Sequence, residues 1–285
     1  MNQFPSFCSN PTWNAKLADL VQEKIFKFDD PQGASNLYEV LSAFYSKVRT
    51  SKEVSLKYPI SFSLIPSFRY VERTAPTIEY VGIDVPVYYN YREDTPKIMV
   101  VGIDPLRSEP DLQKFISLGT PYAFHLTQHN IYWQLMSGLM EQLNLTVYLT
   151  DTFKLYFKFQ GKRSYDIAAF TNPEAYGNGA IHQEIFAREV ELVKPDLIVT
   201  LGKHPRLWFT SIKEPKVSYK RLLEISNNTS DTAHLNLFYN NIPVLPLMHL
   251  SPLVRHNTRI INYGVSSNED IIEKYVEFIK VKLKN

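Results

Sequence analysis

After Pro96, short apolar runs alternate with stretches of helical periodicity, and this alternation constrains the fold more than any other feature of the chain. Each run has the length of a buried strand, and the runs lie at 97–103, 146–149, 196–201 and 242–248. Apolar side chains recur at helical spacing over 128–143, 181–194 and 269–283, the last after a capping pattern at Ser266 to Glu269. Strands that alternate with helices predict a three-layer α/β/α fold around a central, mostly parallel four-stranded sheet.

The first 95 residues carry a different pattern. Helical spacing predicts helices over 14–28 and 36–48, and alternating β-branched and tyrosine residues over 78–91 predict a hairpin or a pair of edge strands. The chain shows no internal repeat and no long linker. We therefore expect an N-terminal helical and β-hairpin extension, residues 1–95, packed on a core domain of residues 96–285.

Composition narrows the possible chemistry. The 285-residue chain has a single cysteine, Cys8, which excludes an internal disulfide and a cysteine-ligated metal cluster. Because the sequence lacks a long apolar run and a signal-peptide pattern, we expect a cytoplasmic protein without a membrane segment. The net charge of only +2 does not itself indicate a nucleic-acid partner. Basic clusters, which solvated loops would also explain, lie at 154–163, 203–206 and 255–259.

Chemically useful side chains follow the apolar runs, at the place where an open α/β sheet binds its ligands. In chain order these residues are Asp104, Asp151, Gly202, Lys203, His249 and Ser251. Taken alone, a strand-end aspartate can simply cap the next helix, and a histidine can simply satisfy a buried backbone group. Together at one edge of a sheet, the two carboxylates and the imidazole predict an active site.

Four ordered motifs resemble those of the uracil-DNA glycosylase superfamily. The segment V-V-G-I-D-P-L (100–106) resembles its Gly-x-Asp-Pro motif, and M-H-L-S-P-L (248–253) resembles its His-Pro-Ser-Pro-Leu motif. Y-L-T-D-T-F-K (148–154) is similar to the strand whose Thr-Asn pair recognises the base, and residues 191–204 are similar to the segment before its phosphate loop. The resemblance covers residues 97–253 and implies the uracil-DNA-glycosylase fold and DNA as the partner.

The resemblance also implies individual roles. Asp104 would orient the attacking water and stabilise positive charge on the sugar, and His249 would donate a hydrogen bond to O2 of the departing base. Phe124 would stack on the flipped base, and Leu253 would fill the gap that the base leaves in the duplex. The residues expected to contact DNA are Gly202, Lys203, Ser251, Leu253 and Arg255.

Two departures from the family pattern indicate the substrate. Asp151 stands where the family usually has asparagine, and an ionised carboxylate only accepts hydrogen bonds, which favours the amino group of cytosine over O4 of uracil. Leu106 replaces the bulky tyrosine with which uracil-specific members exclude substituents at C5, and Ile103 completes the expected base pocket. Candidates to line a sugar pocket are Arg163, Tyr165 and Tyr176.

The resemblance extends to the bacteriophage replication inhibition DNA glycosylases, which excise glucosylated hydroxymethylcytosine from phage DNA. We therefore expect a monofunctional DNA N-glycosylase, monomeric and without a cofactor or metal, that removes hydroxymethyl- or glucosyl-hydroxymethylcytosine and serves in anti-phage defence. The nearest alternative is a uracil-DNA glycosylase of base-excision repair. Others are a DNA-binding module without turnover and a metal-dependent hydrolase with His125 and His129 as ligands, for which no third ligand is evident nearby.

Overall fold

The computed structural model describes residues 11–28, 37–39, 62–64, 78–103, 116–119, 131–159, 162–163, 179–202, 218–227, 237–250 and 256–284. Its helices of eight residues or more are α1 (Pro11–Lys24), α5 (Ile131–Leu143), α6 (Gly179–Val193), α8 (Tyr219–Asn227), α9 (His256–Tyr263) and α10 (Asn268–Lys284). None of these helices has both the length and the apolar character needed to cross a bilayer.

A six-stranded sheet in the order β11-β12-β10-β5-β7-β4 forms the centre of the fold. Its strands are β4 (Val87–Tyr89), β5 (Lys97–Gly102), β7 (Thr146–Asp151), β10 (Leu197–Leu201), β11 (Phe238–Tyr239) and β12 (Ile242–Leu247). Strands β12, β10, β5 and β7 are parallel, whereas β11 and β4 pair antiparallel at the two edges. The prediction of a mostly parallel sheet is therefore confirmed, with two short edge strands added to the four predicted ones.

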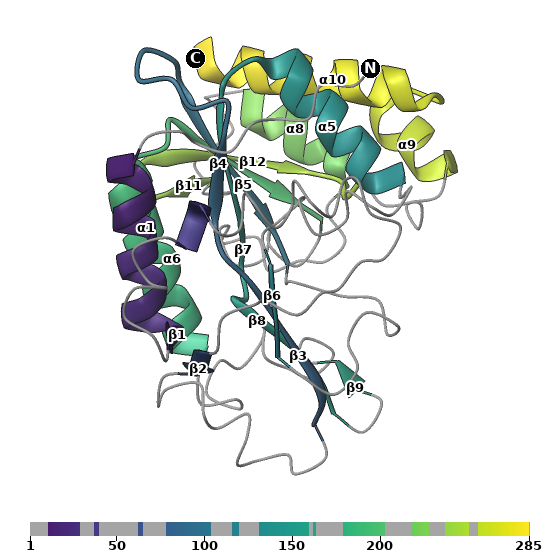
Figure 1. The fold of residues 1–285 in the computed structure, drawn as a ribbon. Helices are drawn as coiled ribbons and strands as arrows, with labels where there is room; N and C mark the ends of the chain where they lie inside the picture. The colour runs from purple at the N-terminus through teal and green to yellow at the C-terminus, as the bar shows by residue number, and fades with distance from the viewer. Residues whose placement is uncertain are drawn as a thin grey trace.

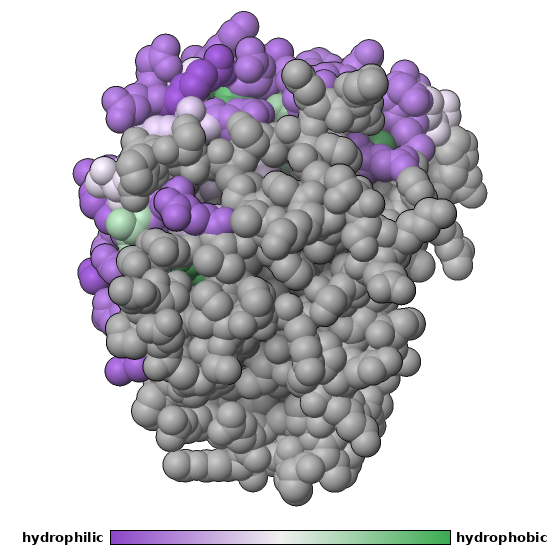
Figure 2. Space-filling model, viewed as in Figure 1, coloured by the Kyte–Doolittle hydropathy of each residue, from purple (hydrophilic) through white to green (hydrophobic). Residues whose placement is uncertain are grey.

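Helices cover both faces of this sheet, which confirms the predicted three layers. Figure 1 shows α1 and α6 on one side and α5, α8, α9 and α10 on the other. Every residue of β10 is buried, as expected for a parallel strand that is covered on both faces. On the face that Figure 2 shows, the described residues are mostly hydrophilic above the sheet, over α10, and beside it, over α1.

A second sheet, in the order β6-β3-β8-β9, continues from the carboxyl end of β7. Its strands are β3 (Ile78–Asp84), β6 (Ile116–Gly119), β8 (Leu155–Phe159) and β9 (Lys162–Arg163), and a separate pair joins β1 (Phe26–Phe28) to β2 (Phe62–Leu64). Of the two alternatives predicted over 78–91, the hairpin is wrong, because β3 pairs with β8 whereas β4 pairs with β7. The prediction of edge strands is confirmed for β4, at one edge of the central sheet, but not for β3, which lies between β6 and β8. Val85 and Pro86 between them are buried, and the chain continues alongside β7 and β8 instead of reversing.

The predicted helices are present with shifted ends. Helix α10 begins with a capping box in which Ser267 Oγ accepts a hydrogen bond from Asp270 N at 3.0 Å, one residue later than predicted. The helix predicted over 14–28 ends at Lys24 and is followed by β1. Of the helix predicted over 36–48, residues 37–39 are helical and the others lie outside the described residues.

Helix α1 packs against the core. The Trp13 ring lies edge-on to Tyr88 of β4 at 5.7 Å between ring centroids, and Lys24 Nζ lies 2.8 Å from Glu184 Oε1 of α6. Leu17, one of several α1 residues in the main hydrophobic core, is also buried. The domain boundary between residues 95 and 96 remains a prediction.

Candidate active site at the carboxyl edge of the sheet

The four parallel strands end side by side. Gly102 of β5 pairs with Asp151 of β7, and Gly202 N, just after β10, donates to Leu247 O of β12 at 2.8 Å. His249 follows β12 by two residues. Since neighbouring strands are about 4.8 Å apart, the ends of β5 and β12 lie about 10 Å from each other across β10. Residues that follow these strands can therefore flank one small ligand.

The Asp151 carboxylate lies over the backbone of Gly102. A Cβ atom at residue 102 would overlap Asp151 Oδ1, so any residue larger than glycine would displace the carboxylate. Hydrogen bonds beyond the ladder hold the two strand ends together, since Thr152 N donates to Gly102 O at 3.0 Å and Phe153 N donates to Ile103 O at 2.9 Å. These two hydrogen bonds fix the backbone of Gly102 and Ile103 at the end of β5.

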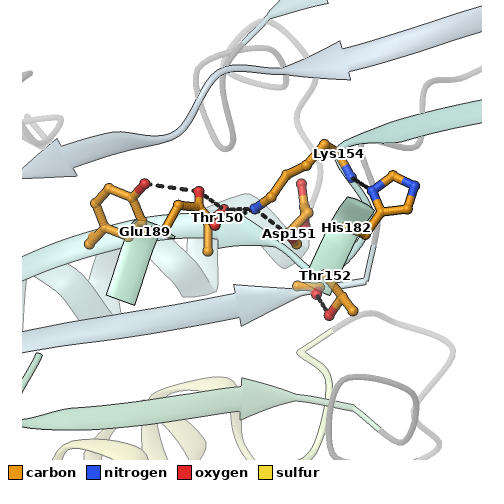
Figure 3. A network of polar contacts seen from close by, with 8 residues as sticks. Thr150, Asp151, Thr152, Lys154, His182 and Glu189 are labelled. Atoms are coloured by element: carbon orange, nitrogen blue, oxygen red, sulfur yellow. Dashed lines mark hydrogen bonds and ion pairs between the residues drawn. The ribbon is translucent and has the colours of Figure 1, made fainter. Parts of the chain in front are cut away.

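A buried ion pair lies next to the Asp151 main chain (Figure 3). Lys154 Nζ lies 2.6 Å from Glu189 Oε2 of α6, and the two side chains are 1% and 0% exposed. The ammonium also donates to Thr150 Oγ1 at 2.5 Å and to the Asp151 carbonyl at 2.6 Å. The three N–H groups of the lysine thus all have acceptors, and one of these acceptors is the main chain of Asp151.

Both carboxylate oxygens of Glu189 also have hydrogen-bond partners, since Oε2 accepts from Lys154. Its Oε1 accepts hydrogen bonds from the Tyr148 hydroxyl at 2.9 Å and from Thr150 Oγ1 at 2.8 Å. Burial, followed by the nearby Glu189 charge, raises the pKa of Tyr148 well above its ordinary value. The phenol therefore stays protonated and remains a donor to the carboxylate.

His182, in the first turn of α6, contacts the turn that follows β7 and contains Lys154. Its Nδ1 accepts a hydrogen bond from Lys154 N at 3.1 Å, and its ring lies edge-on to Phe153 at 5.1 Å between centroids. Burial, with a further contribution from the Lys154 charge, lowers the pKa of His182 to about 3. The imidazole is therefore neutral at pH 7 and accepts at Nδ1.

The sequence alone did not identify Lys154, Glu189 or His182 as parts of the site. The sequence places Lys154 in a basic cluster at 154–163, but the side chain is buried and paired with Glu189, so it cannot contribute to a basic surface. An available signal was the pair of polar residues on β7, Tyr148 and Thr150, which share one face of a buried strand. Polar groups in such a place need buried partners.

His249 packs against Gly202. The backbone of Gly202 has a positive φ of 96°, and a Cβ added there would lie 3.4 Å from His249 Cβ. Glycine is favoured by both the φ angle and the close approach of the histidine. Burial lowers the pKa of His249 to about 4, so its imidazole is neutral at pH 7 and has one N–H to donate.

Two buried tyrosines hold the residue before His249. Met248 N donates to the Tyr263 hydroxyl at 3.0 Å, and the Tyr275 hydroxyl donates to Met248 O at 2.6 Å. The two rings pack edge to face, with 5.7 Å between their centroids, and they come from α9 and α10. Helices on one face of the sheet therefore fix the main chain that presents the imidazole.

The other predicted site residues are distributed as follows. Ile103 directly follows β5 and is half-buried, and Arg163 pairs with Lys158 in the second sheet, where its role in a sugar pocket remains a prediction. Outside the described residues lie Asp104, Leu106, Phe124, Tyr165, Tyr176, Lys203, Ser251, Leu253 and Arg255, together with His125 and His129. Within the described ranges, no group of three or more His, Cys, Asp or Glu side chains could hold a metal ion.

A comparison with protein families finds a match to the model of the Uracil DNA glycosylase superfamily over residues 89–280, more than half of the chain. The matched segment includes β5, β7, β10 and β12, and with them every strand end described above. A comparison with curated proteins finds no match.

Proposed function

We propose that this chain, which belongs to the uracil DNA glycosylase superfamily, excises a modified cytosine, hydroxymethylated or glucosylated, from DNA. Members of the superfamily are DNA N-glycosylases that remove damaged or modified bases, and DNA is their substrate. The observation that carries the choice of base is the Asp151 carboxylate at the tip of β7, held over Gly102.

A carboxylate at this position selects for a donor on the base. An ionised aspartate only accepts hydrogen bonds, so it can bind the exocyclic amino group of cytosine but opposes the O4 acceptor of uracil. The asparagine usual at this position in the superfamily can donate to O4, and aspartate cannot. Unmodified cytosine is excluded as a target because its removal would destroy the host genome, which leaves a modified cytosine. The resemblance to the bacteriophage replication inhibition DNA glycosylases supports the modified cytosines of phage DNA as the target and a role in anti-phage defence.

The proposed mechanism stabilises charge at both ends of the breaking bond. As the N-glycosidic bond breaks, positive charge develops on the deoxyribose and negative charge on the base. Asp104, two residues after Gly102, would orient the attacking water and stabilise the sugar, and the neutral imidazole of His249 would donate to O2 of the base. Water adds to C1′ of the sugar, the base leaves with the bonding electrons, and an abasic site remains.

The remaining predicted residues would bind the flipped nucleotide and its backbone. Phe124 would stack on the base, Leu253 would occupy the vacated space, and Leu106 with Ile103 would leave room for a C5 substituent. Phosphate contacts are proposed for Gly202, Lys203, Ser251 and Arg255. The sugar of a glucosylated base would meet Arg163, Tyr165 and Tyr176.

The test is a parallel assay on DNA that contains plain cytosine, hydroxymethylcytosine, glucosyl-hydroxymethylcytosine or uracil, with abasic sites as the readout. We expect excision of a modified cytosine, loss of most turnover with Asp104→Ala or His249→Ala at unchanged DNA affinity, and a shift toward uracil with Asp151→Asn. A matched control is Asp196→Asn, because Asp196 accepts a hydrogen bond from Lys97 N at 2.8 Å at the opposite end of the sheet.

Each outcome of this assay is informative. Efficient excision of uracil by the wild-type chain, with modified cytosine left intact, would replace the proposed substrate with that of a repair uracil-DNA glycosylase. Binding of all four DNAs without abasic sites would indicate a DNA-binding module instead. Selectivity that Asp151→Asn leaves unchanged would remove the assigned role of Asp151.

A further inference from the structure

The ion pair between Lys154 and Glu189 is a feature that the glycosylase mechanism does not use. Both side chains are almost completely buried, and their charged atoms are 2.6 Å apart. Neither side chain is proposed to contact DNA. A buried pair of this kind is a poor means of stabilising a fold, because the loss of hydration offsets much of the attraction and apolar replacements are often as stable. Its position at the site points to a second role.

The network connects three elements at one point. Thr150 and Asp151 belong to β7, Lys154 lies in the turn that follows β7, and Glu189 lies in the third turn of α6. Figure 3 shows the Lys154 ammonium between the end of β7 and Glu189, with His182 at the other end of the lysine residue. The turn after β7 is thus tied to α6 through both the side chain and the backbone of one residue.

We propose that Lys154 is a positioning residue for base recognition, which through its hydrogen bond to the Asp151 carbonyl holds the Asp151 carboxylate over Gly102. Glu189 orients the ammonium and balances its charge, so the network positions the Asp151 carboxylate without adding a net charge near the site. This proposal rests on the proposed function, because it assumes that Asp151 selects the base.

The geometry explains why one hydrogen bond can matter at this position. The Asp151 side chain extends from a main chain whose carbonyl accepts from Lys154 at 2.6 Å, and its carboxylate fits where residue 102 has no side chain. A small rotation of the strand end would therefore move the carboxylate relative to a base held from the other side. Misplacement of a positioning group by about 1 Å can reduce a rate on the order of 100-fold.

The experiment uses the double variant Lys154→Met/Glu189→Gln, which removes both charges at nearly constant volume and leaves no lone buried charge. We expect its chemical-denaturation midpoint to stay close to that of the wild type. Turnover of the modified cytosine should fall on the order of 10- to 100-fold in kcat with little change in KM, and the ratio of modified-cytosine to uracil excision should move toward that of Asp151→Asn. Lys274→Met/Glu277→Gln makes the same change in an exposed pair 2.6 Å apart on α10 and should alter neither ratio nor rate.

Combinations with variants of Asp151 separate this proposal from the proposed function. If Lys154 acts through the Asp151 side chain, Lys154→Met/Glu189→Gln should not change base selectivity further once Asp151→Ala has removed that side chain. Failure of Asp151→Asn itself to change selectivity would overturn the assignment of Asp151, and with it the proposed substrate. A selectivity change with Asp151→Asn but none with Lys154→Met/Glu189→Gln would overturn the positioning role alone.

A second variant keeps the proposal testable if the double variant does not fold. Thr150→Val preserves shape and both charges but removes one acceptor of the ammonium and one donor to Glu189. It should shift the selectivity ratio in the same direction by a smaller factor. A folded Thr150→Val protein with wild-type selectivity and kcat would overturn the proposal.

Discussion

Alanine at residue 102 should displace the Asp151 carboxylate, and the size of this effect can be derived from the contacts of Gly102. The added Cβ would overlap Asp151 Oδ1 and lie 3.5 Å from Asp151 Cγ, whereas its next neighbour, Thr150 O, is at an ordinary 3.9 Å. Gly102 is not among the glycines with positive φ, so alanine adds no backbone strain. The clash therefore involves one side chain, and removing that side chain should remove the cost.

A double-mutant cycle of residues 102 and 151 measures the clash between the added Cβ and the Asp151 side chain. Overpacking costs about 1–3 kcal/mol, and a side chain forced about 30° from its rotamer costs about 0.5–1.5 kcal/mol, so we expect Gly102→Ala to destabilise the wild type by about 1–2 kcal/mol. In an Asp151→Ala background the same change should cost close to nothing, which makes the coupling energy about 1–2 kcal/mol. Asp151→Ala also removes the other contacts of Asp151, but it does so whether residue 102 is glycine or alanine, so their contribution cancels in the coupling energy.

Urea unfolding of the four proteins, followed by circular dichroism, measures the coupling. The control is Gly138→Ala in the same two backgrounds, because a Cβ at Gly138 would meet Ile272 Cδ1 at 2.8 Å and not Asp151. Its cost should be additive with that of Asp151→Ala. Equal costs of Gly102→Ala in both backgrounds would refute the placement of the carboxylate over residue 102.

Three further predictions follow from the buried groups. The ratio of kcat/KM between the wild type and His249→Gln should stay constant from neutral pH down to about pH 5, because burial lowers the pKa of His249 to about 4; a decline that begins near pH 6.5 would contradict a neutral, buried imidazole. The unfolded state binds a proton at His182 below about pH 6.5, and the native state does so only near its lowered pKa of about 3, so stability falls as the pH drops through this window. His182→Asn keeps an acceptor for Lys154 N and should flatten the dependence of the urea midpoint on pH, whereas an unchanged slope would contradict the assignment. Tyr275→Phe removes the donor to Met248 O and should cost about 1–3 kcal/mol in urea unfolding, with a fall in kcat at unchanged DNA affinity; a variant as stable and active as the wild type would contradict the role of this hydrogen bond.

The strand-end residues could be predicted from the sequence because local patterns determine them. A buried parallel strand appears as a continuous apolar run, and the rule that ligands bind beyond carboxyl ends needs no knowledge of which strands are neighbours. Asp151, Gly202 and His249 were found in this way, and the structure brings the ends of their strands together. The register that sets Gly102 beside Asp151 required coordinates.

The network around Lys154 could not be found from local patterns. Its partner Glu189 is 35 residues away in the sequence, and a lysine within a basic segment is normally solvated. Only tertiary packing decides that this lysine is buried. Glu189 itself indicates a buried ion pair, because it lies on α6 between buried apolar residues such as Phe186 and Val190, where an acidic side chain needs a partner.

Turn chemistry explains two further differences. The short hairpin between β11 and β12 was not predicted, although it turns on Asn240 and Asn241, which both have positive φ, the backbone conformation that asparagine tolerates in such turns. The second difference concerns Pro86, which interrupts the run 78–91 and thereby favoured a hairpin or a pair of edge strands there. The chain instead passes from one sheet into the next at this point, because β7 and β8 offer continuous partners to β4 and β3.

The two polar side chains proposed to hydrogen-bond the base, Asp151 and His249, are anchored from opposite layers of the fold. Asp151 is held through Lys154 by Glu189 of α6, on one face of the sheet, whereas the chain before His249 is held by Tyr275 of α10, on the other. The described hydrogen bonds of these two networks share no residue, and distant sites without common partners contribute independently. A change in the first network should therefore alter both the choice of base and the rate for the modified cytosine, whereas a change in the second should alter only how fast any base is removed. Combining Lys154→Met/Glu189→Gln with Tyr275→Phe should multiply the two effects on kcat/KM, and a strongly non-multiplicative result would mean that the two anchors act as one unit.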